Sequence, residues 1–434
     1  MTQDINFTQK IVKACRNKIN LQHYVDFSSI RGNNYVTEMQ RTITLLGSDA
    51  SSCQLFTGYI GCGKSIELLK LKSKLEEEGF YVTYFDITED LELEKVSNID
   101  ITDILLSIAR RVHESLKLIQ IKLELGYFNK LFKEFQNSFN LPDFEVGGEL
   151  SIGIAKITAK AKETAEMRSK IKESFLQPRT SDIVSSINND IFKCAAEPLS
   201  KKGKKGLVVI VDNLDRVDSS PSSSEKIEYR NLFIDPGERL KKLQCHIIYT
   251  IPLALTFSST TYGQVTQRLS SGVPPKVLTM VDVNTGIDLL RQVVLARAFP
   301  EVTEQERINL IPKLFQDFRG LDYLCKVSGG HLGQLLSWIQ TCCANEDPPF
   351  SVNCVKKVVR EYCEDLARRV KEEDWDLLFQ VLQKQTLTEQ AEYQILLQNM
   401  LIFEYRTQKP RRFEINPALK QTERYRSLAA ARGF

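Results

Sequence analysis

The stretch that decides the fold of this chain is Gly58-Tyr59-Ile60-Gly61-Cys62-Gly63-Lys64-Ser65. It fits the pattern G-x-x-x-x-G-K-[ST] without a gap. Glycines let a backbone curl until consecutive N–H groups point inward at phosphate oxygens. A lysine at the seventh position reaches the β- and γ-phosphates of a nucleotide, and a hydroxyl at the eighth ligates Mg²⁺. The stretch therefore predicts a phosphate-binding loop, with Cys62 as a variable small residue rather than a catalytic thiol.

The residues on either side of the loop supply the context that this motif needs. Cys53–Thr57 (CQLFT) is a short apolar run typical of a buried strand, and it stops at the first glycine of the loop. Ser65–Glu78 has apolar residues at helical spacing, and Phe80–Ile87 (FYVTYFDI) indicates a second strand. The helix directs the positive end of its dipole at the phosphates, and we include Ile66 of its first turn in the nucleotide-binding set. Strand, loop, helix and strand form the βαβ unit of a parallel sheet, which favours a true phosphate-binding loop over a chance match.

A second motif ends the most strand-like segment of the chain, Leu207–Val211 (LVVIV), which Asp212 follows. In parallel α/β sheets, ligands collect at the carboxyl ends of the strands. Asp212 is therefore the predicted Mg²⁺ carboxylate, acting mainly through the water shell of the ion, and a simple strand-ending turn residue is the alternative. His246–Ile251 and Lys276–Met280 are two further predicted strands. The predicted fold class is α/β, with a parallel sheet that carries a nucleotide-binding loop.

The run from Val211 to Arg216, VDNLDR, resembles the D-x-L-D-R signature of the KAP and STAND branches of P-loop ATPases. With both motifs placed, residues 30–340 resemble an AAA+/STAND ATPase module with a helical lid. The resemblance implies that the chain binds ATP with Mg²⁺ and hydrolyses it. AAA+ ATPases usually follow the Walker B aspartate with a glutamate that activates water, whereas this chain has Asn213 there. Asp215 is then the candidate water-activating acid, with a local ion pair to Arg216 as the alternative, and slow hydrolysis is expected.

The same resemblance implies roles for residues outside the two motifs. The strand after Walker B ends in a polar sensor of the γ-phosphate, and Thr250 stands at that position, with a buried strand threonine as the alternative. The segment Asp26–Gly32, which contains Arg31, occupies the place of the segment that wraps adenine. No N-K-x-D motif for guanine is present, which also favours ATP. A neighbouring subunit commonly supplies an arginine that stabilises charge during phosphoryl transfer. The candidates for that arginine are Arg268 first, and then Arg239 and Arg230.

The predicted lid departs from its family at one position. Origin-recognition-like and STAND ATPases often carry a G-G-x-x-R motif there, whose arginine reaches the nucleotide. The matching stretch Ser328–Gln334 is SGGHLGQ, and Gly333 stands where the arginine is expected. The usual lid cation is therefore missing, and we assign its role to no residue, although His331 or Gln334 could partly replace it. A plain helix break at the two glycines is the alternative.

Composition and periodicity divide the chain into four predicted parts. They are an N-terminal helical and adenine-side segment at 1–50, an α/β ATPase domain at 51–283 with an insertion at about 119–175, a helical lid at 284–372 and a C-terminal module at 373–434. Within the insertion, Val146–Ala161 alternates enough to suggest a hairpin-like excursion. Ser181–Ala195 follows as a helix with a Ser-Asp cap. The lid is expected to contain helices only, among them Glu304–Phe315.

The C-terminal module combines two predicted helices with a β-hairpin, in which a TQKP turn joins Leu401–Arg406 to Arg411–Asn416. Helices followed by a two-stranded wing suggest a winged helix. The basic residues of the module are Arg406, Lys409, Arg411, Arg412, Lys420, Arg424, Arg426 and Arg432. Such a surface can contact the phosphates of double-stranded DNA, form a solvated face or dock a protein.

Composition narrows the classes of protein that remain. With 42% hydrophobic and 26% charged residues and a formal net charge of +3, the chain has an ordinary globular composition, and its global charge argues neither for nor against nucleic acid. The ten cysteines include no C-x-x-C pair, so neither a zinc site nor a disulfide framework is expected. The N-terminus lacks a secretory pattern, and no apolar stretch approaches the ~20 residues of a membrane span. We therefore expect a reduced, cytoplasmic protein without a membrane partner.

Three functions remain open. The leading hypothesis is a regulatory ATPase whose nucleotide state controls assembly of a homo-oligomer or engagement of DNA or a partner protein. ATPases that resemble this chain occur in prokaryotic defence, transposition and replication initiation. The alternative is a nucleotide-bound scaffold with little or no hydrolysis, which Asn213 and Gly333 favour. A small-molecule kinase is the third, disfavoured by the helical C-terminal portion and the lack of an acceptor-binding motif.

Overall fold

The chain forms two compact units, each assembled from more than one segment. The computed structural model describes residues 2–16, 20–91, 99–141, 149–216, 230–234, 236–270, 272–389, 391–406 and 411–434. Unit 1 contains Met1–Tyr35, Gly58–Glu67 and Val277–Phe434, and unit 2 contains Val36–Thr57 and Leu68–Lys276. The phosphate-binding loop and the N-terminal segment thus group with the C-terminal half of the chain. The predicted domain boundaries at 50, 283 and 372 stay a prediction. The two compact units are each made of several chain segments, whereas the predicted domains are continuous.

A parallel sheet carries the two motifs. Its strands are β1 (Cys53–Gly58), β2 (Tyr81–Asp86), β3 (Leu207–Asp212), β4 (His246–Thr250) and β5 (Lys276–Leu278), in the order β2-β3-β4-β1-β5. Pairing is parallel between β2 and β3, between β3 and β4, and between β4 and β1. All residues of β1, β3 and β4 are buried, as continuous apolar runs in a parallel sheet require. The predicted α/β fold is confirmed, and its register sets Asp86 directly opposite Asp212.

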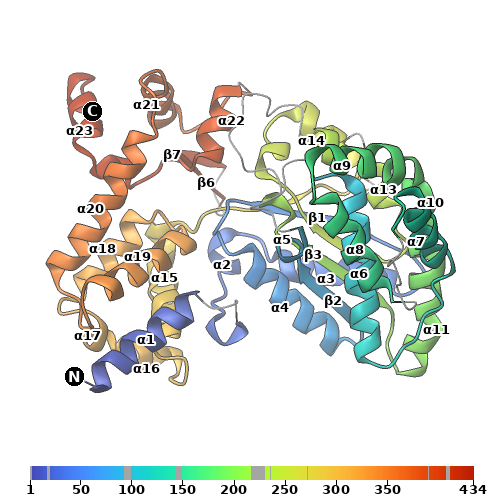
Figure 1. The fold of residues 1–434 in the computed structure, drawn as a ribbon. Coiled ribbons are helices and arrows are strands. Elements are labelled where there is room, and N and C mark those ends of the chain that lie inside the picture. Colours follow the sequence, from blue (N-terminus) through green and yellow to red (C-terminus); the bar gives the residue numbers. More distant parts are fainter. Residues whose placement is uncertain are drawn as a thin grey trace. The chain divides into compact units, whose positions relative to one another are not determined.

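Helices lie around this sheet (Figure 1). Those lying wholly or mainly in unit 2 are α3 (Tyr35–Leu46), α4 (Lys64–Glu77), α5 (Ile87–Leu91), α6 (Ile101–Leu118), α7 (Gly126–Ser138), α8 (Leu150–Ala161), α9 (Ala165–Ser169), η2 (Lys170–Leu176), η3 (Gln177–Arg179), α10 (Thr180–Ser186), η4 (Ile187–Lys193), α11 (Cys194–Lys201), η5 (Leu214–Arg216), η6 (Arg230–Ile234), α13 (Gly237–Lys241), η7 (Leu253–Thr256) and α14 (Ser259–Arg268).

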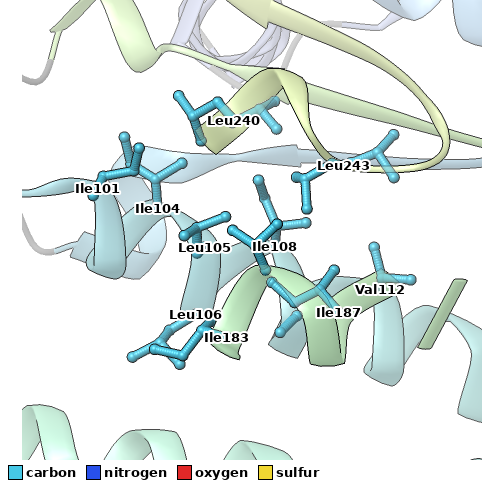
Figure 2. Packing of buried hydrophobic residues seen from close by; sticks show 14 of the residues in the cluster. Ile101, Ile104, Leu105, Leu106, Ile108, Val112, Ile183, Ile187, Leu240 and Leu243 are labelled. Atoms are coloured by element: carbon cyan, nitrogen blue, oxygen red, sulfur yellow. The ribbon is translucent and has the colours of Figure 1, made fainter. Parts of the chain in front are cut away.

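Helix α6 is the centre of the core of unit 2. Asp100 begins it with a capping box, accepting from the N–H groups of Thr102 and Asp103. Its apolar side chains then recur at helical spacing and pack against α10, η4 and α13, where Ile183 and Leu240 are seen facing them in Figure 2. Burying each Leu or Ile side chain stabilises the fold by ~1.5–3 kcal/mol. This packing fixes the helical layer beside β2, the strand that ends at Asp86.

The insertion is helical where the sequence suggested a hairpin-like excursion, so that prediction is wrong. Residues 150–161 form α8, and the predicted stretch from 146 to 148 lies outside the described residues. The buried positions of α8 are Leu150, Gly153, Ile154 and Ile157, which is helical spacing. A Cβ at Gly153 would lie 2.4 Å from the Phe132 ring, so the glycine that lowers helix propensity is required by the contact with α7.

The predicted helix at Ser181–Ala195 is present, but its Ser-Asp cap is not. Helical turns run without interruption from Ala165 to Lys201, and α10 begins at Thr180 after Arg179, which makes no side-chain capping bond. A cap is unnecessary there, because the preceding turns already satisfy the N–H groups that begin an isolated helix.

Unit 1 is mainly helical. Its elements are α1 (Thr2–Arg16), η1 (Leu21–His23), α2 (Ser28–Arg31), α15 (Val283–Ala298), α16 (Glu304–Ile308), α17 (Ile311–Leu314), α18 (Arg319–Val327), α19 (Leu332–Asn345), α20 (Val352–Arg368), α21 (Asp374–Lys384), α22 (Ala391–Gln398), β6 (Ile402–Tyr405), β7 (Arg412–Ile415), η8 (Leu419–Gln421) and α23 (Glu423–Ala431). α1 packs against α15 and α19 (Figure 1). The helix predicted at Glu304–Phe315 is two helices, because Pro312 cannot continue the first and stands in the first turn of the second.

The C-terminal hairpin is confirmed. β6 and β7 pair antiparallel, with Phe403 opposite Glu414, and the predicted TQKP turn at 407–410 lies outside the described residues. Helix α21 packs against β7, and α22 packs against β6. The winged-helix assignment of this module stays a prediction. Within the described part of the chain, no helix has both the length and the apolar character that crossing a bilayer requires.

Candidate nucleotide-binding site

In unit 1, every carbonyl oxygen of the loop from Gly58 to Gly63 accepts a hydrogen bond. In loop order the donors are Lys64 Nζ at 3.0 Å, Lys64 Nζ again at 2.9 Å, His331 Nε2 at 2.7 Å, the Gly333 N–H at 2.9 Å, Arg31 Nη2 at 2.8 Å and the Glu67 N–H at 3.3 Å. In a trans peptide the N–H points away from the C=O, so a carbonyl that accepts a hydrogen bond leaves the N–H of the same peptide facing the other way. The Cys62 N–H is itself engaged, because it donates to the Tyr59 carbonyl at 3.2 Å. Within the described residues, the N–H groups of Gly61 and Gly63 donate to no backbone carbonyl. Backbone amides of this kind can bind an anion.

Two glycines of the loop are required by close approach. Gly58 has a φ of +155°, and a Cβ there would lie 2.3 Å from the carbonyl oxygen of Leu278. Gly61 has a φ of +82°, and a Cβ there would lie 2.7 Å from the His331 ring. Both positions therefore need glycine for space as well as for backbone conformation. The predicted loop has the local form that its motif demands.

The side chains of the predicted nucleotide-binding loop differ in how deeply they are buried. Lys64 is buried with its ammonium on the carbonyls of Gly58 and Tyr59, and Ser65 and Ile66 are half-buried in the first turn of α4. Ile60 is the exposed member of the loop. Cys62 is buried, with its Sγ 3.7 Å from the Leu278 carbonyl oxygen, which agrees with a packing role for the thiol.

Arg31 supports the loop from the N-terminal segment. It is 3% exposed, donates from Nη2 to the Cys62 carbonyl, and lies 3.7 Å from the Glu67 carboxylate through Nη1. Tyr24 donates to the same carboxylate at 3.2 Å. Burial lowers the pKa of Arg31, and the negative field of Glu67 opposes that effect. The sequence grouped Arg31 with nucleotide contacts, and the structure places its guanidinium on a loop carbonyl.

The lid stretch Ser328–Gln334 contacts the loop directly. His331 donates from Nε2 to the Ile60 carbonyl and accepts the Gln334 N–H at Nδ1, 2.8 Å away, which fixes the neutral Nε2–H tautomer. Burial lowers the pKa of His331 and favours that neutral form. A Cβ at Gly333 would lie 3.1 Å from the Cα of Gly61. At the position where the motif predicted an arginine, the structure thus has a backbone contact that leaves little room for a side chain.

The C-terminal hairpin also reaches the loop. Tyr59 is buried, and its hydroxyl accepts the Glu404 N–H of β6 at 2.9 Å. Phe403 of the same strand lies edge-on to the Tyr59 ring and stacks on His331 at a centroid distance of 6.1 Å. Tyr405 donates to the Gly329 carbonyl at 2.8 Å. Sequence reasoning missed this role of Tyr59, because a variable motif position gives no signal of a partner 345 residues away.

In unit 2, the second motif forms a hydrogen-bonded cluster at the ends of β2 and β3. Asp212 is fully buried, with Oδ1 accepting the Asn213 N–H at 2.7 Å and Oδ2 accepting the Tyr84 hydroxyl at 2.7 Å. Asn213 has a φ of +58° and donates from Nδ2 to Asp86 Oδ2 at 2.6 Å. The other oxygen of Asp86 accepts both the N–H and the hydroxyl of Thr88. Sequence reasoning missed Tyr84 and Asp86, although an aspartate ending the predicted strand FYVTYFDI was an available signal.

The three remaining predicted residues lie in unit 2 with distinct surroundings. Thr250 is fully buried and accepts the Leu214 N–H at 2.9 Å, so it holds the turn that follows Asp212. Asp215 is buried in η5, and Arg268 is the half-buried last residue of α14. Of the alternative arginines, Arg239 is exposed on α13 and the side chain of Arg230 lies outside the described residues. The sensor, acid and trans-acting roles stay predictions.

The residues present fit Mg-ATP. The amides of the loop suit phosphate oxygens, and Lys64 adds a fixed positive charge. Mg²⁺ in phosphate sites takes one or two protein oxygens and completes its shell with water and phosphate, so it needs no protein cage. Among the described residues, no group of three or more His, Cys, Asp or Glu side chains is arranged to hold a metal ion. The hard-oxygen donors Ser65 and Asp212 are of the kind that Mg²⁺ prefers.

Comparison with known proteins gives structural similarity without sequence similarity. No protein-family model matches the sequence, and no curated protein matches it either. Its structural neighbours are a Walker-type ATPase and ORC and CDC6 proteins.

The Walker-type ATPase of Pyrococcus abyssi is 13% identical, covering 88% of this chain and 93% of its own at a TM-score of 0.40. The ORC2 protein of Aeropyrum pernix in ADPNP–ADP complexes is 12% identical, covering 97% and 98% at a TM-score of 0.41. The ORC1 protein of the same organism in complex with DNA is 13% identical, covering 92% and 94% at a TM-score of 0.36. At these identities the likeness assigns neither ligand nor activity to this chain.

Proposed function

We propose that the chain binds Mg-ATP at residues 58–66 and hydrolyses it slowly, as a regulatory ATPase whose nucleotide state controls contact with a partner. The observation that carries the proposal is that all six loop carbonyls accept hydrogen bonds, while among the described residues the N–H groups of Gly61 and Gly63 donate to no backbone carbonyl. That arrangement prepares the loop amides for phosphate before a nucleotide arrives, so little ordering free energy is needed on binding. The buried ammonium of Lys64 supplies the charge that favours the triphosphate.

The proposed chemistry assigns a role to each group of residues. Ser65 and Asp212 hold Mg²⁺, which neutralises phosphate charge when bound. Thr250 holds the turn after Asp212 and is the candidate sensor, and Asp215 is the candidate acid that orients the attacking water. Arg268 is the candidate to stabilise developing charge from a neighbouring copy in a homo-oligomer.

A nucleotide-bound scaffold is the second candidate, and one observation favours it. Asn213 stands where a water-activating glutamate would be, and its amide donates to Asp86. An amide can orient a water molecule but cannot accept its proton, so turnover at this position is weak at best. Asp215→Asn separates the candidates: turnover falls steeply if Asp215 positions the water, and a scaffold has no turnover to lose.

The identity of the partner is tested on the same material. Five arginines of the C-terminal module are engaged in ion pairs: Arg406 and Arg411 with Glu404, Arg412 with Asp282, Arg424 with Glu372 and Arg432 with Asp376. The pairs of Arg424 and Arg432 are exposed, and pairs of that kind contribute only ~0–1 kcal/mol, so phosphates of double-stranded DNA can displace them. The carboxylates of Glu404 and Asp282 are buried, so they hold Arg406, Arg411 and Arg412 more firmly. DNA binding through this surface would therefore be weak and strongly salt-dependent.

The deciding experiment is steady-state ATP hydrolysis by the wild-type chain and Lys64→Ala, with and without double-stranded DNA. Turnover that requires Lys64 and rises with DNA supports a DNA-engaged regulatory ATPase. Turnover that requires Lys64 and ignores DNA directs the search to a protein partner. Tight ATP binding without turnover supports the scaffold, and a wild-type chain that binds no ATP refutes both.

A further inference from the structure

His331 is held at both ring nitrogens by two different parts of unit 1. Nδ1 accepts the Gln334 N–H and so caps α19, and Nε2 donates to the Ile60 carbonyl of the phosphate-binding loop at 2.7 Å. The side chain is 6% exposed, so water does not compete effectively for either bond. Its ring therefore forms a rigid connection between the start of the lid helix and the loop.

Helix capping alone does not explain a histidine at this position. Ser, Asp and Asn cap helices as well or better, and each would satisfy the Gln334 N–H. None of these shorter side chains would also reach the Ile60 carbonyl, which His331 bonds through Nε2. The Nε2 bond is what the histidine adds, and it fixes the third residue of the loop, next to Gly61, whose own carbonyl is held by Gly333.

The same ring faces the C-terminal hairpin. Phe403 stacks on it with an interplanar angle of 21°, and Phe403 also contacts Tyr59, the second residue of the loop. A shift of the loop at residues 59–61 must therefore move the ring, its aromatic partner or both. Packed side chains with close contacts on all sides transmit such shifts rather than absorb them.

We propose that His331 is a positioning residue of the phosphate-binding loop, which through Phe403 links ATP binding to the state of the hairpin β6–β7. The inference rests on the proposed binding of ATP and adds its regulation. His331 touches no phosphate; it acts by holding the Ile60 carbonyl outward, so that the loop amides stay aligned. Linkage then requires reciprocity, because a hairpin stabilised by ATP must in turn strengthen ATP binding.

A matched pair of variants separates this role from capping. In His331→Asn, the amide occupies the place of Nδ1, so the cap on Gln334 survives and the bond to Ile60 is lost. In His331→Gln, the longer amide reaches the place of Nε2, so the bond to Ile60 survives and the cap is lost. Both variants lose the stacked ring equally, which leaves the two hydrogen bonds as the difference between them.

The measurements are the Kd of Mg-ATP by calorimetry and the hydrogen exchange of the Gln334 amide in the full chain. His331→Asn should bind Mg-ATP about 2- to 12-fold more weakly than His331→Gln, from the loss of one buried hydrogen bond. The Gln334 amide should exchange faster in His331→Gln than in His331→Asn. The positioning role is overturned if the two variants bind equally or if affinity follows the cap.

The link to the hairpin is read from exchange in β6 with and without Mg-ATP. In the wild type, ATP should slow exchange at the Glu404 amide, which donates to Tyr59, and both variants should lose most of this response. Unchanged exchange in a wild type that binds ATP overturns the link while the proposed function stands. A wild type that binds no ATP overturns the proposed function and this inference with it.

Discussion

Gly330→Ala in the lid should disrupt the turn that brings His331 to the loop. Gly330 has a φ of +78°, and a Cβ there would lie 1.9 Å from the Val281 carbonyl oxygen. Gly203 has nearly the same φ, +75°, with no heavy atom within 4 Å of an added Cβ. The left-handed conformation costs an alanine ~1–2 kcal/mol at either position. Overpacking against immobile backbone adds ~1–3 kcal/mol at Gly330 alone, giving a loss of ~2–5 kcal/mol there against ~1–2 kcal/mol for Gly203→Ala.

Hydrogen exchange is the suitable assay, because a chain of two units need not unfold in one step. The reporter for Gly330→Ala is the Gly333 amide, which donates to the Gly61 carbonyl, and the reporter for Gly203→Ala is the Lys205 amide. ATP affinity should fall with Gly330→Ala and stay unchanged with Gly203→Ala. Equal losses of protection in the two variants would refute the argument, since the backbone conformation would then account for the whole effect.

The structure predicts the direction in which three further perturbations change the stability of the chain. Gly153→Ala should lower the free energy of unfolding of unit 2 by ~1–3 kcal/mol in urea, although alanine normally favours a helix, because its Cβ would overlap the Phe132 ring. Tyr84→Phe removes the hydroxyl that donates to the Asp212 carboxylate and should cost ~1.5–3 kcal/mol in the same assay. Stability should decrease as the pH falls below 6.5, measured by thermal unfolding. Burial lowers the pKa of His331 and of the other three histidines, so the unfolded chain binds more protons in that range.

Each of these predictions has its own control. Gly126→Ala, at the start of α7 with no atom within 4 Å of an added Cβ, should stabilise unit 2 or leave it unchanged. Tyr81 lies on the same strand as Tyr84, and its hydroxyl donates a neutral hydrogen bond to the Ser115 carbonyl of α6. Tyr81→Phe removes that bond and should cost less than Tyr84→Phe, ~0.5–1.5 kcal/mol. His331→Gln should reduce the loss of stability on acidification. Stability that rises between pH 7 and pH 5.5 would contradict the assignment of neutral, buried imidazoles.

The loop and the sheet could be predicted because their signals are local. The run LVVIV is short and rich in β-branched residues, which favours a buried strand, and its aspartate stands where the strand ends. The insertion could not be predicted in the same way. VGGELSIGIAKITAKA alternates like a strand and also places apolar residues at helical spacing, so only burial against α6 and α7 decides between them.

The details of the candidate site depended on distant partners. Gly333 stands where the resemblance predicted an arginine, and its close contact lies 272 residues earlier, at Gly61. The sequence shows that Asn213 stands where a glutamate was expected. It does not show that the Asn213 amide donates to Asp86, because strand order and register bring these two residues together. Sequence pattern thus located the loop, and tertiary packing determined which side chains hold it.

The composition of unit 1 has a consequence for how the chain is made. Its N-terminal 35 residues and the loop belong with residues 277–434, whereas unit 2 closes with residue 276. Synthesis runs at ~5–20 residues per second. The helices around the sheet can therefore pack together before the lid residues that contact the loop have been made. His331 and Phe403 are synthesised after all of unit 2, so the loop gains two of its contacts only after unit 2 has been made. A nascent chain stalled before residue 331 should therefore fold its sheet without yet having the completed phosphate-binding loop.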